Sequence, residues 1–489
     1  MTLLQLDVEL LHSAIINACY NLIAQREALN AINLFPVADG DTGNNMAATA
    51  KSIIHHGKIQ PTLEGTLRSI ANAGILGARG NSGMIFSQFF NGLLESGTVP
   101  AQLNSKQLTD LIRAASRSVR SSIVNPVEGT ILTVMEAWSA ALDQLAEQTE
   151  CIIELLQHSV TAVNEAIQST TNTLAVLKEA QVVDAGALGF GIFIEGFASH
   201  IKSPEHLQIY EELTACDDHD HDLPGSDAPP ANRYCTEAML AGECIDKTQL
   251  SDCLQTMGDS IVITANKSLS RLHIHTNQPQ QVFSALSTFA KVQYPKVDDM
   301  LRQYEVLHAR QGKIALVTDS SANIPQEILD QYQIHMIPLN VQFDGHDLLD
   351  KYGIDSNTFY DHLAGLATYP TTSCPSPAII NEKIKHLAEH YEEVLIISVA
   401  QVLSGTHDAM VNAAKALNNV HIINSKQVSG SQGLLVYYAA ELIASGQNID
   451  AIKHALTDKI SKTRILVMVN QFDSLIRSSV HDKNFMTDR

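Results

Sequence analysis

The chain has 489 residues, of which 45% are hydrophobic, and a formal net charge of −21 at pH 7. This length is enough for roughly two to four domains, each with its own core. The negative charge argues against binding to nucleic acids or anionic lipid surfaces, because both are themselves negatively charged. Seven scattered cysteines, an odd number, do not indicate a disulfide framework.

Two further features concern the compartment. The sequence contains no uninterrupted apolar run long enough to span a membrane. Its first residues do not combine a basic stretch with an apolar one, so we expect no signal peptide. The sequence therefore predicts a cytoplasmic protein without a transmembrane segment.

The first expected element is an amphipathic helix, because apolar residues recur at three- and four-residue steps between residues 4 and 22. Pro36 then stops helical propagation. Asp39 and Asp41 follow in a glycine-containing segment, residues 33–46, where the backbone can approach a ligand closely. Hard cations such as Mg²⁺ take oxygen ligands and often share substrate phosphates. The segment predicts a metal–phosphate site, with an Asp-Gly-Asp surface turn as the alternative.

Three more glycine-containing segments follow along the chain, at residues 73–84, 125–130 and 183–191. The first lacks the Lys-Ser/Thr ending of a P-loop, but its small residues could admit a base or present amides to phosphate. The second precedes an apolar helical pattern over residues 131–142. Each segment alone is most simply a loop between helices, whereas the ordered series suggests one shared site.

Together these segments resemble the nucleotide-binding domain of dihydroxyacetone kinases of the DhaL type, most closely the version that begins bacterial fatty acid kinase. The resemblance covers roughly residues 1–200, and its most specific words are Asp-Gly-Asp-Thr-Gly-x-Asn-Met and Gly-Ala-Arg-Gly-Asn-Ser-Gly. It implies an all-α helical barrel that holds ATP in loops at one end. It also implies Mg²⁺ between the phosphates and the carboxylates of Asp39 and Asp41.

The resemblance extends to the other nucleotide contacts. It implies that Thr42, Asn44 and Asn45 line the phosphates, that Asn81 and Ser82 approach the nucleotide, that Thr130 lies at its pocket, and that Asp184 and Gly186 close it. Dihydroxyacetone kinases have a further aspartate before the pair. Leu34 occupies that position here, so Asn33 is the candidate third ligand.

An acidic, histidine-containing run at residues 216–222, followed by several prolines, predicts a solvated linker. A metal-binding tail is the alternative. We expect a kinase domain at residues 1–205, a linker at 206–232, a middle domain at 233–310 and a third domain at 311–489.

Residues 260–264 and 271–276 predict a β-hairpin. His273 and His275 are two residues apart, so their imidazoles leave the same face of the strand. With the thiolate of Cys235, this set suits zinc. The alternative is that both histidines face solvent and Cys235 is a core residue.

The words around these residues look like the middle domain of fatty acid kinase. The matching stretches are residues 233–237, 257–260 and 273–277. The resemblance implies an α+β domain in which Cys235, His273 and His275 bind zinc.

Beyond residue 312, apolar runs at residues 314–317, 394–398, 421–425 and 465–469 predict buried strands with helices between them. This alternation is typical of a parallel α/β sheet, whose ligands gather at the C-terminal ends of the strands. The loops at residues 371–377 and 403–406 offer hydroxyls and amides suited to a carboxylate. Turns and helix caps are the alternative role of such residues.

Thr-Asp-Ser, Thr-Thr-Ser-x-Pro-Ser and Leu-Ser-Gly-Thr resemble, in this order, the DegV family of fatty-acid-binding proteins. The resemblance implies that Thr372 and Ser404, with Ser373 beside them, hold a fatty acid carboxylate. In that family the acyl chain lies between two lobes, but here no Gly-Gly-Arg turn into a second lobe follows residues 470–475. Each CH₂ left in water would weaken binding by about 0.8 kcal/mol, so tight binding by this chain alone stays open.

The motifs predict an ATP-dependent kinase that phosphorylates a fatty acid carboxylate to an acyl phosphate, with a fused lipid-binding domain. The cofactors would be ATP, Mg²⁺ and Zn²⁺. The expected partners are a fatty acid or another acyl carboxylate and a separate full-length DegV-like acyl carrier; a homodimer stays open. A dihydroxyacetone-type small-molecule kinase, a non-catalytic ATP- and lipid-binding regulatory protein and a damaged reading frame are the alternatives.

Overall fold

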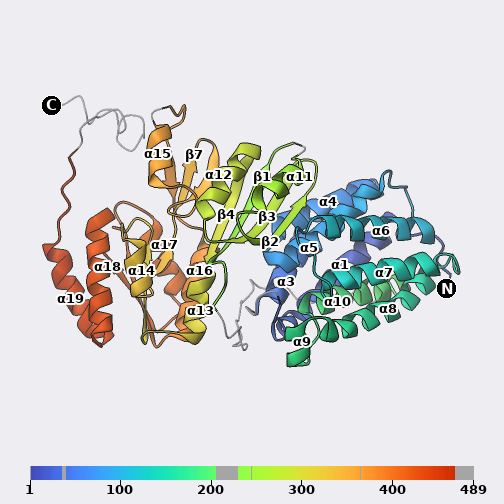
Figure 1. The fold of residues 1–489 in the computed structure, drawn as a ribbon, viewed down its shortest axis with the longest axis horizontal. Helices are drawn as coiled ribbons and strands as arrows, with labels where there is room; N and C mark the ends of the chain where they lie inside the picture. Colours follow the sequence, from blue (N-terminus) through green and yellow to red (C-terminus); the bar gives the residue numbers. More distant parts are fainter. Residues whose placement is uncertain (1, 36–39, 205–228, 244, 364, 469–489) are drawn as a thin grey trace. The chain divides into compact units, whose positions relative to one another are not determined.

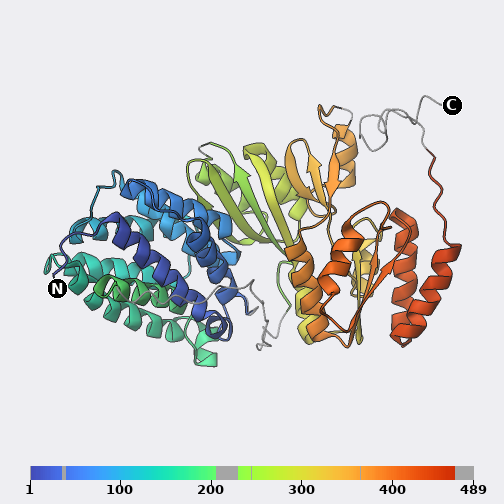
Figure 2. The same ribbon diagram turned by 180° about the vertical axis from the view of Figure 1, so that it is seen from behind.

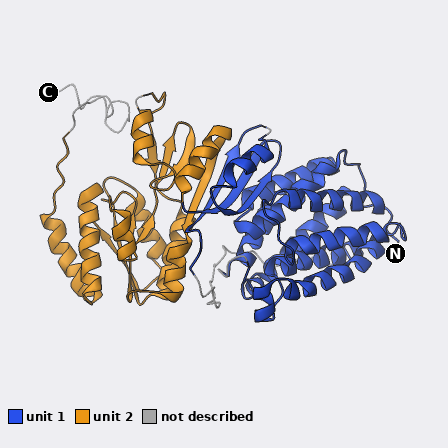
Figure 3. Ribbon diagram, viewed as in Figure 1, with its two compact units in different colours: residues 1–277 blue, residues 278–489 orange. Residues whose placement is uncertain are grey.

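The computed structural model describes residues 2–35, 40–204, 229–243, 245–363 and 365–468. It consists of two compact units, residues 1–277 and 278–489 (Figure 3). Most of the predicted linker at 206–232 lies outside the described residues, as do Asp39 and the segment after residue 468. The predicted domain boundaries stay predictions.

The first two hundred residues form helices, as the sequence predicts (Figure 1). In chain order they are α1 (Val8–Ala24), α2 (Arg26–Asn30), α3 (Thr42–His56), α4 (Leu63–Gly77), α5 (Gly80–Gly92), the 3₁₀ helix η1 (Leu93–Ser96), α6 (Ser105–Ser121), α7 (Ile131–Leu145), α8 (Ile152–Thr173), α9 (Ala175–Ala180) and α10 (Ala185–Lys202). The expected first helix begins at Val8, where Asp7 caps it by accepting the N–H of Leu10.

The core of this helical region is aromatic. Helix α10 contacts α1, α3, α7 and α8. Its Phe190 lies edge-on to Phe89 of α5, with ring centroids 5.1 Å apart, and to Trp138 of α7, at 6.0 Å. The indole N–H of Trp138 donates to the hydroxyl of Ser159 at 3.0 Å, which satisfies the polar atom of this buried ring. The apolar stripes of the helices therefore meet in one core.

A small antiparallel sheet completes the first unit. It contains β1 (Tyr234–Ala241), β2 (Asp259–Ala265) and β3 (Leu269–Thr276), adjacent in the order β2-β3-β1, with α11 (Lys247–Leu254) between β1 and β2. Strands β2 and β3 are the expected hairpin. Val262 of β2 belongs to the same hydrophobic core as α5, so this sheet packs on the helical region of its own unit.

The second unit is an α/β structure, as predicted. Its elements are α12 (Pro279–Phe289), β4 (Lys291–Asp299), α13 (Met300–His308), β5 (Ile314–Asp319), α14 (Gln326–Gln331), β6 (His335–Ile337), β7 (Asn340–Phe343), β8 (His346–Leu349), α15 (Ser356–Leu363), β9 (Thr371–Ser373), α16 (Pro377–His390), β10 (Glu393–Ser398), α17 (Thr406–Ala414), β11 (Val420–Asn424), α18 (Ser429–Ala444) and α19 (Ile449–Lys462).

A parallel sheet in the order β11-β10-β5-β6 forms the centre of this unit. Helices α14, α18 and α19 cover one face, and α13, α16 and α17 cover the other (Figures 1 and 2). Because both faces are buried, the strands are apolar throughout rather than alternating. This doubly covered sheet confirms the predicted parallel α/β fold.

Two local predictions in this unit differ from the structure. Residues 371–373, expected as a loop, form β9, which pairs antiparallel with β7 in a second sheet. The strand expected at residues 465–469 is wrong over 465–468, which have no regular secondary structure. Leu466 is 95% exposed and Met468 is 87% exposed. An apolar β-rich run becomes a strand only where another strand pairs with it, and residues 465–468 pair with no strand in the described part of the chain.

Candidate functional site

The N-termini of α3 and α5 lie against each other. Gly80, the first residue of α5, has φ +53°, and a Cβ atom there would lie 2.1 Å from Nδ2 of Asn45 in α3. The hydroxyl oxygens of Thr42 and Ser82 are 3.2 Å apart, and Thr42 also donates to Oδ1 of Asn33. The first N–H groups of a helix lack partners within it and carry the positive end of its dipole. Two adjacent N-termini therefore favour an anionic ligand.

Two buried side-chain oxygens at these helix starts, Oδ1 of Asn44 and Oδ1 of Asn81, have no hydrogen-bond partner among the described residues. Buried polar atoms usually have partners, so unpaired ones call for an explanation. The half-buried Asp41 immediately precedes α3 and adds a carboxylate. Oxygen ligands beside helix N–H groups fit a phosphate with its hard cation. Asp39 lies outside the described residues, so the carboxylate pair stays a prediction.

A second pair of helix starts carries the remaining predicted residues. Thr130 and Asp184 occupy the N-cap positions of α7 and α10, and Asp184 accepts the N–H of Ala187 at 2.7 Å. Asp184 also accepts a backbone hydrogen bond from Ile131, which joins the two helix starts. Gly186 packs on the same residue, since a Cβ there would lie 3.5 Å from Cβ of Ile131.

The two pairs of helix starts are neighbours. A Cβ atom on Gly189 in α10 would lie 2.7 Å from Sδ of Met46 in α3, one turn into each helix. The N-terminal turns therefore adjoin in the order α5, α3, α10, α7. The structure thus brings the predicted nucleotide residues that it describes onto four neighbouring helix starts.

Asp184 is an acid held inside the protein. Burial raises the pKa of its carboxyl group to about 6, although backbone hydrogen bonds from Ala187, Ile131 and Gly186 oppose the shift. In the unfolded chain the pKa would be about 3.9. The folded state therefore binds more protons between these values, and the free energy of unfolding falls as pH rises from about 4 to about 6. The difference corresponds to about 3 kcal/mol.

We expect Asp184→Asn to remove this pH dependence, because asparagine caps a helix equally well but has no charge to bury. Thermal unfolding of both proteins at pH 4.5 and pH 7 measures it. The mutant should gain stability relative to wild type at the higher pH. Asp7→Asn, the same exchange at the N-cap of α1, is the control. Equal pH slopes in wild type and Asp184→Asn would contradict the prediction.

The three predicted zinc ligands lie together in the sheet of the first unit. The antiparallel register places Cys235 opposite His275. Their ligand atoms and those of His273 all lie within 4.8 Å of one another. Sγ of Cys235 is 3.7 Å from Nδ1 of His273, and Nε2 of His273 is 3.1 Å from Nε2 of His275.

Both imidazoles are buried, so the expectation that they face solvent is wrong. Burial, with a smaller contribution from His273, lowers the pKa of His275 to about 3. A neutral imidazole is the form that binds metals. One sulfur and two nitrogen donors fit a zinc centre with three protein ligands and a fourth position for water or another group.

Glu237, which the sequence reasoning missed, connects this cluster to the start of α5. Its carboxylate is 2% exposed and accepts the backbone N–H of Gly80 at 2.7 Å. The same oxygen, Oε1, is 3.1 Å from Nδ1 of His273. The available signal was its spacing, because Glu237 is two residues after Cys235 and therefore shares its strand face.

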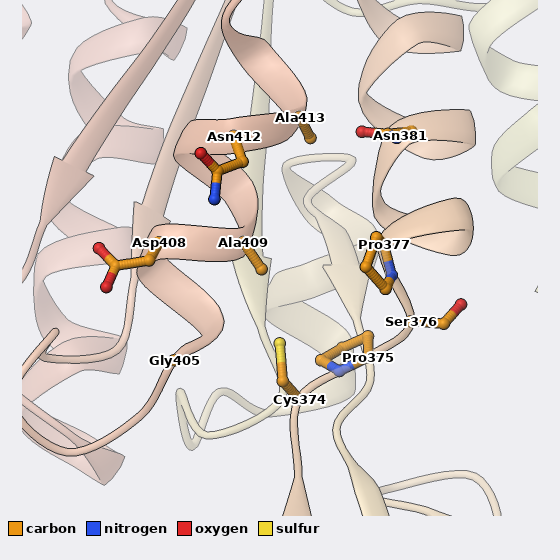
Figure 4. Close-up of a pocket in the computed structure, with 10 residues that line it drawn as sticks. All are labelled: Cys374, Pro375, Ser376, Pro377, Asn381, Gly405, Asp408, Ala409, Asn412 and Ala413. Carbon is orange, nitrogen blue, oxygen red and sulfur yellow. The ribbon is translucent and has the colours of Figure 1, made fainter.

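In the second unit, the loops predicted to hold a carboxylate adjoin one cavity of about 550 Å³ (Figure 4). Cys374 and Pro375, which follow Thr372 and Ser373, line one side, and the residues that follow Ser404 line the other; the lining is Cys374, Pro375, Ser376, Pro377, Asn381, Gly405, Asp408, Ala409, Asn412 and Ala413. Residues 371–373 are exposed. The hydroxyls of Ser404 and Thr406 are 2.9 Å apart at the start of α17.

Three family models match the chain. The DAK2 domain matches residues 36–199, the middle domain of FakA-like fatty acid kinases matches residues 231–307, and the uncharacterised DegV family matches residues 313–479. The chain has a fatty acid kinase-like domain architecture. The three matches follow one another in the order that the motifs predict.

Curated relatives of this fatty acid kinase-like chain include uncharacterised proteins of Staphylococcus aureus strains USA300 and NCTC 8325. Each is 31% identical over 320 residues, which is 63% of this chain and 58% of the relative. The chain therefore spans less than two thirds of the length of these relatives.

Similar solved structures include a DegV family protein from Thermus thermophilus, whose description is fatty acid binding. It is 28% identical, with a TM-score of 0.30, over 30% of this chain and 54% of that chain. DegV of Bacillus subtilis, described as a fatty acid binding protein, is 31% identical with a TM-score of 0.29, over 31% and 55%. Among the described residues, no helix is long and apolar enough to cross a membrane.

Proposed function

We propose that the chain is an ATP-dependent kinase that phosphorylates the carboxylate of a fatty acid to an acyl phosphate. The observation that carries the proposal is the meeting of the α3 and α5 N-termini, with the unpaired buried oxygens of Asn44 and Asn81 beside them. The domain architecture supports the acyl substrate class.

In this proposal the protein groups position the phosphates of ATP. The first N–H groups of α3 and α5 and the hydroxyls of Thr42 and Ser82 would bind phosphate oxygens. Asp39 and Asp41 would hold Mg²⁺, which supplies charge neutralisation when bound. Thr130, Asp184 and Gly186, on the adjoining helix starts, would line the rest of the nucleotide.

The acceptor would be held in the second unit. A carboxylate is already ionised at neutral pH, so the reaction needs no general base, and catalysis depends on positioning and electrostatic stabilisation. Thr372, Ser373 and Ser404 would orient this carboxylate beside the cavity of about 550 Å³. That volume falls in the range of about 300–1,000 Å³ typical of small-molecule sites.

Trapping with hydroxylamine tests the proposal, because acyl phosphates give stable hydroxamates. We expect hydroxamate when the protein is incubated with Mg²⁺, ATP and a fatty acid, and at least about a tenfold loss in the Thr372→Ala, Ser404→Ala double mutant, since orienting contacts strongly affect rate. Ser376→Ala, which removes a hydroxyl from the cavity rim and the N-cap of α16, is the matched control.

The other outcomes distinguish the alternatives. Hydroxamate that forms only with an added full-length DegV-like protein would mean that the acyl carrier acts in trans. Phosphorylation of dihydroxyacetone without hydroxamate would favour a small-molecule kinase. ATP binding without turnover on either substrate would favour a regulatory protein and overturn the proposed function.

A further inference from the structure

Glu237 uses both carboxylate oxygens inside the first unit. Oε1 accepts the N–H of Gly80 at 2.7 Å and lies 3.1 Å from Nδ1 of His273. Oε2 accepts from Nη2 of Arg271 at 3.2 Å. A carboxylate buried to this degree is stable only when it is paired and hydrogen-bonded, and these contacts meet that requirement.

Arg271 extends the network to α4. Its Nη1 donates to the backbone oxygen of Leu76 at 3.2 Å and lies 3.5 Å from that of Ile75, both in the last turn of α4. A cation therefore lies at the C-terminus of α4 and an anion at the N-terminus of α5, the arrangement that helix dipoles favour. The turn between the two helices is thus held from both sides by the sheet.

The position of Gly80 transmits this constraint to the nucleotide residues. Gly80 packs on Asn45 so closely that no Cβ atom would fit, and Asn81 and Ser82 follow it in the first turn of α5. A movement of the Gly80 amide would therefore move the residues proposed to bind phosphate.

The cluster of Cys235, His273 and His275 controls the other side of Glu237. Nε2 of His273 faces Nε2 of His275 at 3.1 Å, while Nδ1 faces Glu237. A histidine that binds a metal commonly donates its second ring N–H to a carboxylate. A metal that fixes the ring of His273 would therefore also fix Glu237.

We propose that Glu237 is a positioning residue that couples the Cys235, His273 and His275 metal centre to the nucleotide site through the Gly80 amide. Metal binding then tightens nucleotide binding, and nucleotide tightens metal binding by the same factor, because coupling between two sites is reciprocal. This inference rests on the proposed nucleotide site and adds regulation of that site by the metal.

Calorimetry on the full chain tests the coupling, with Mg²⁺-ADP as the probe before and after chelation and reloading of Zn²⁺. We expect zinc to tighten ADP binding on the order of tenfold, within the usual range of such couplings. A chelator competition should show the same factor for zinc affinity at saturating ADP. In Glu237→Gln the factor should fall towards one, while zinc and ADP each still bind.

Asp259→Asn is the matched control. Asp259 has a carboxylate 3.7 Å from Nδ1 of His275, but its other contact is Asn232 rather than the α4–α5 turn. This variant should keep the wild-type coupling factor. A purely structural role of Glu237 would instead lower the melting temperature and leave the coupling factor unchanged.

The wild-type measurement decides the inference even if Glu237→Gln fails to fold. ADP binding with the same Kd in the zinc-loaded and zinc-free chain would overturn the coupling but not the nucleotide site. Absence of ADP binding in both states would overturn the proposed function and the coupling together. Wild-type coupling that persists in folded Glu237→Gln would overturn the role of Glu237.

Discussion

Asp41→Asn is expected to reduce magnesium-dependent ATP turnover by about a thousandfold or more, since removing one electrostatic contact to a reacting phosphate commonly has effects of this order. Asp41 directly precedes α3, and its neighbour Thr42 lies 3.2 Å from Ser82 of α5. Its carboxylate is therefore next to the adjoining helix starts where the phosphates are proposed to bind. The exchange removes one charge from the proposed Mg²⁺ site.

Folding of the Asp41→Asn protein should be retained. Asparagine has nearly the same shape as aspartate and is an equally good residue at a helix N-cap position. A coupled assay of ADP release at saturating Mg²⁺ measures turnover, and circular dichroism checks the fold. Asp7→Asn makes the same exchange at the start of α1, where Asp7 accepts the N–H of Leu10 at 2.9 Å, and should leave turnover unchanged. Wild-type turnover in a folded Asp41→Asn protein would end the assignment of this site.

The second large effect concerns zinc content. The ligand atoms of Cys235, His273 and His275 lie within 4.8 Å of one another. We expect the purified protein to hold about one zinc per chain, and the His273→Ala, His275→Ala double mutant to hold almost none. Loss of two of three protein ligands leaves a single thiolate, which cannot complete a zinc site. Elemental analysis by mass spectrometry, after dialysis in metal-free buffer, measures the stoichiometry.

A matched pair of histidines elsewhere provides the control. His386 and His390 lie side by side on α16, with ring centroids 4.5 Å apart, in the second unit. The His386→Ala, His390→Ala double mutant should keep the wild-type zinc content. Absence of zinc from wild type, or full zinc in the His273→Ala, His275→Ala mutant, would disprove the metal centre.

Features carried by short sequence patterns were predictable. The three- and four-residue spacing of apolar residues gave the first helix, and the two-residue spacing of His273 and His275 put both imidazoles on one strand face. Uniformly apolar runs gave the strands of the parallel sheet, because strands covered on both faces have no polar side. These patterns are local, so no knowledge of the distant chain is needed to read them.

The same local logic failed where a neighbour decided the outcome. Residues 465–468 have the composition of a buried strand, but no strand pairs with them in the described part of the chain, and they are exposed. Residues 371–373 have the composition of a loop, yet β7 provides a partner and they form β9. Strand formation depends on pairing and burial as well as on intrinsic preference.

The sequence by itself determined the three successive fold types and the residue types available for phosphate, metal and carboxylate chemistry. Tertiary structure alone decided which of these residues meet. It opposed Cys235 to His275 across two strands, and it brought Gly80 within 2.7 Å of Glu237, which is 157 residues further along the chain. Such contacts depend on how the sheet packs on α5, and packing follows from shape complementarity and the satisfaction of buried polar groups over the whole unit. A periodic pattern in one segment contains no information about the partner on which that segment will pack.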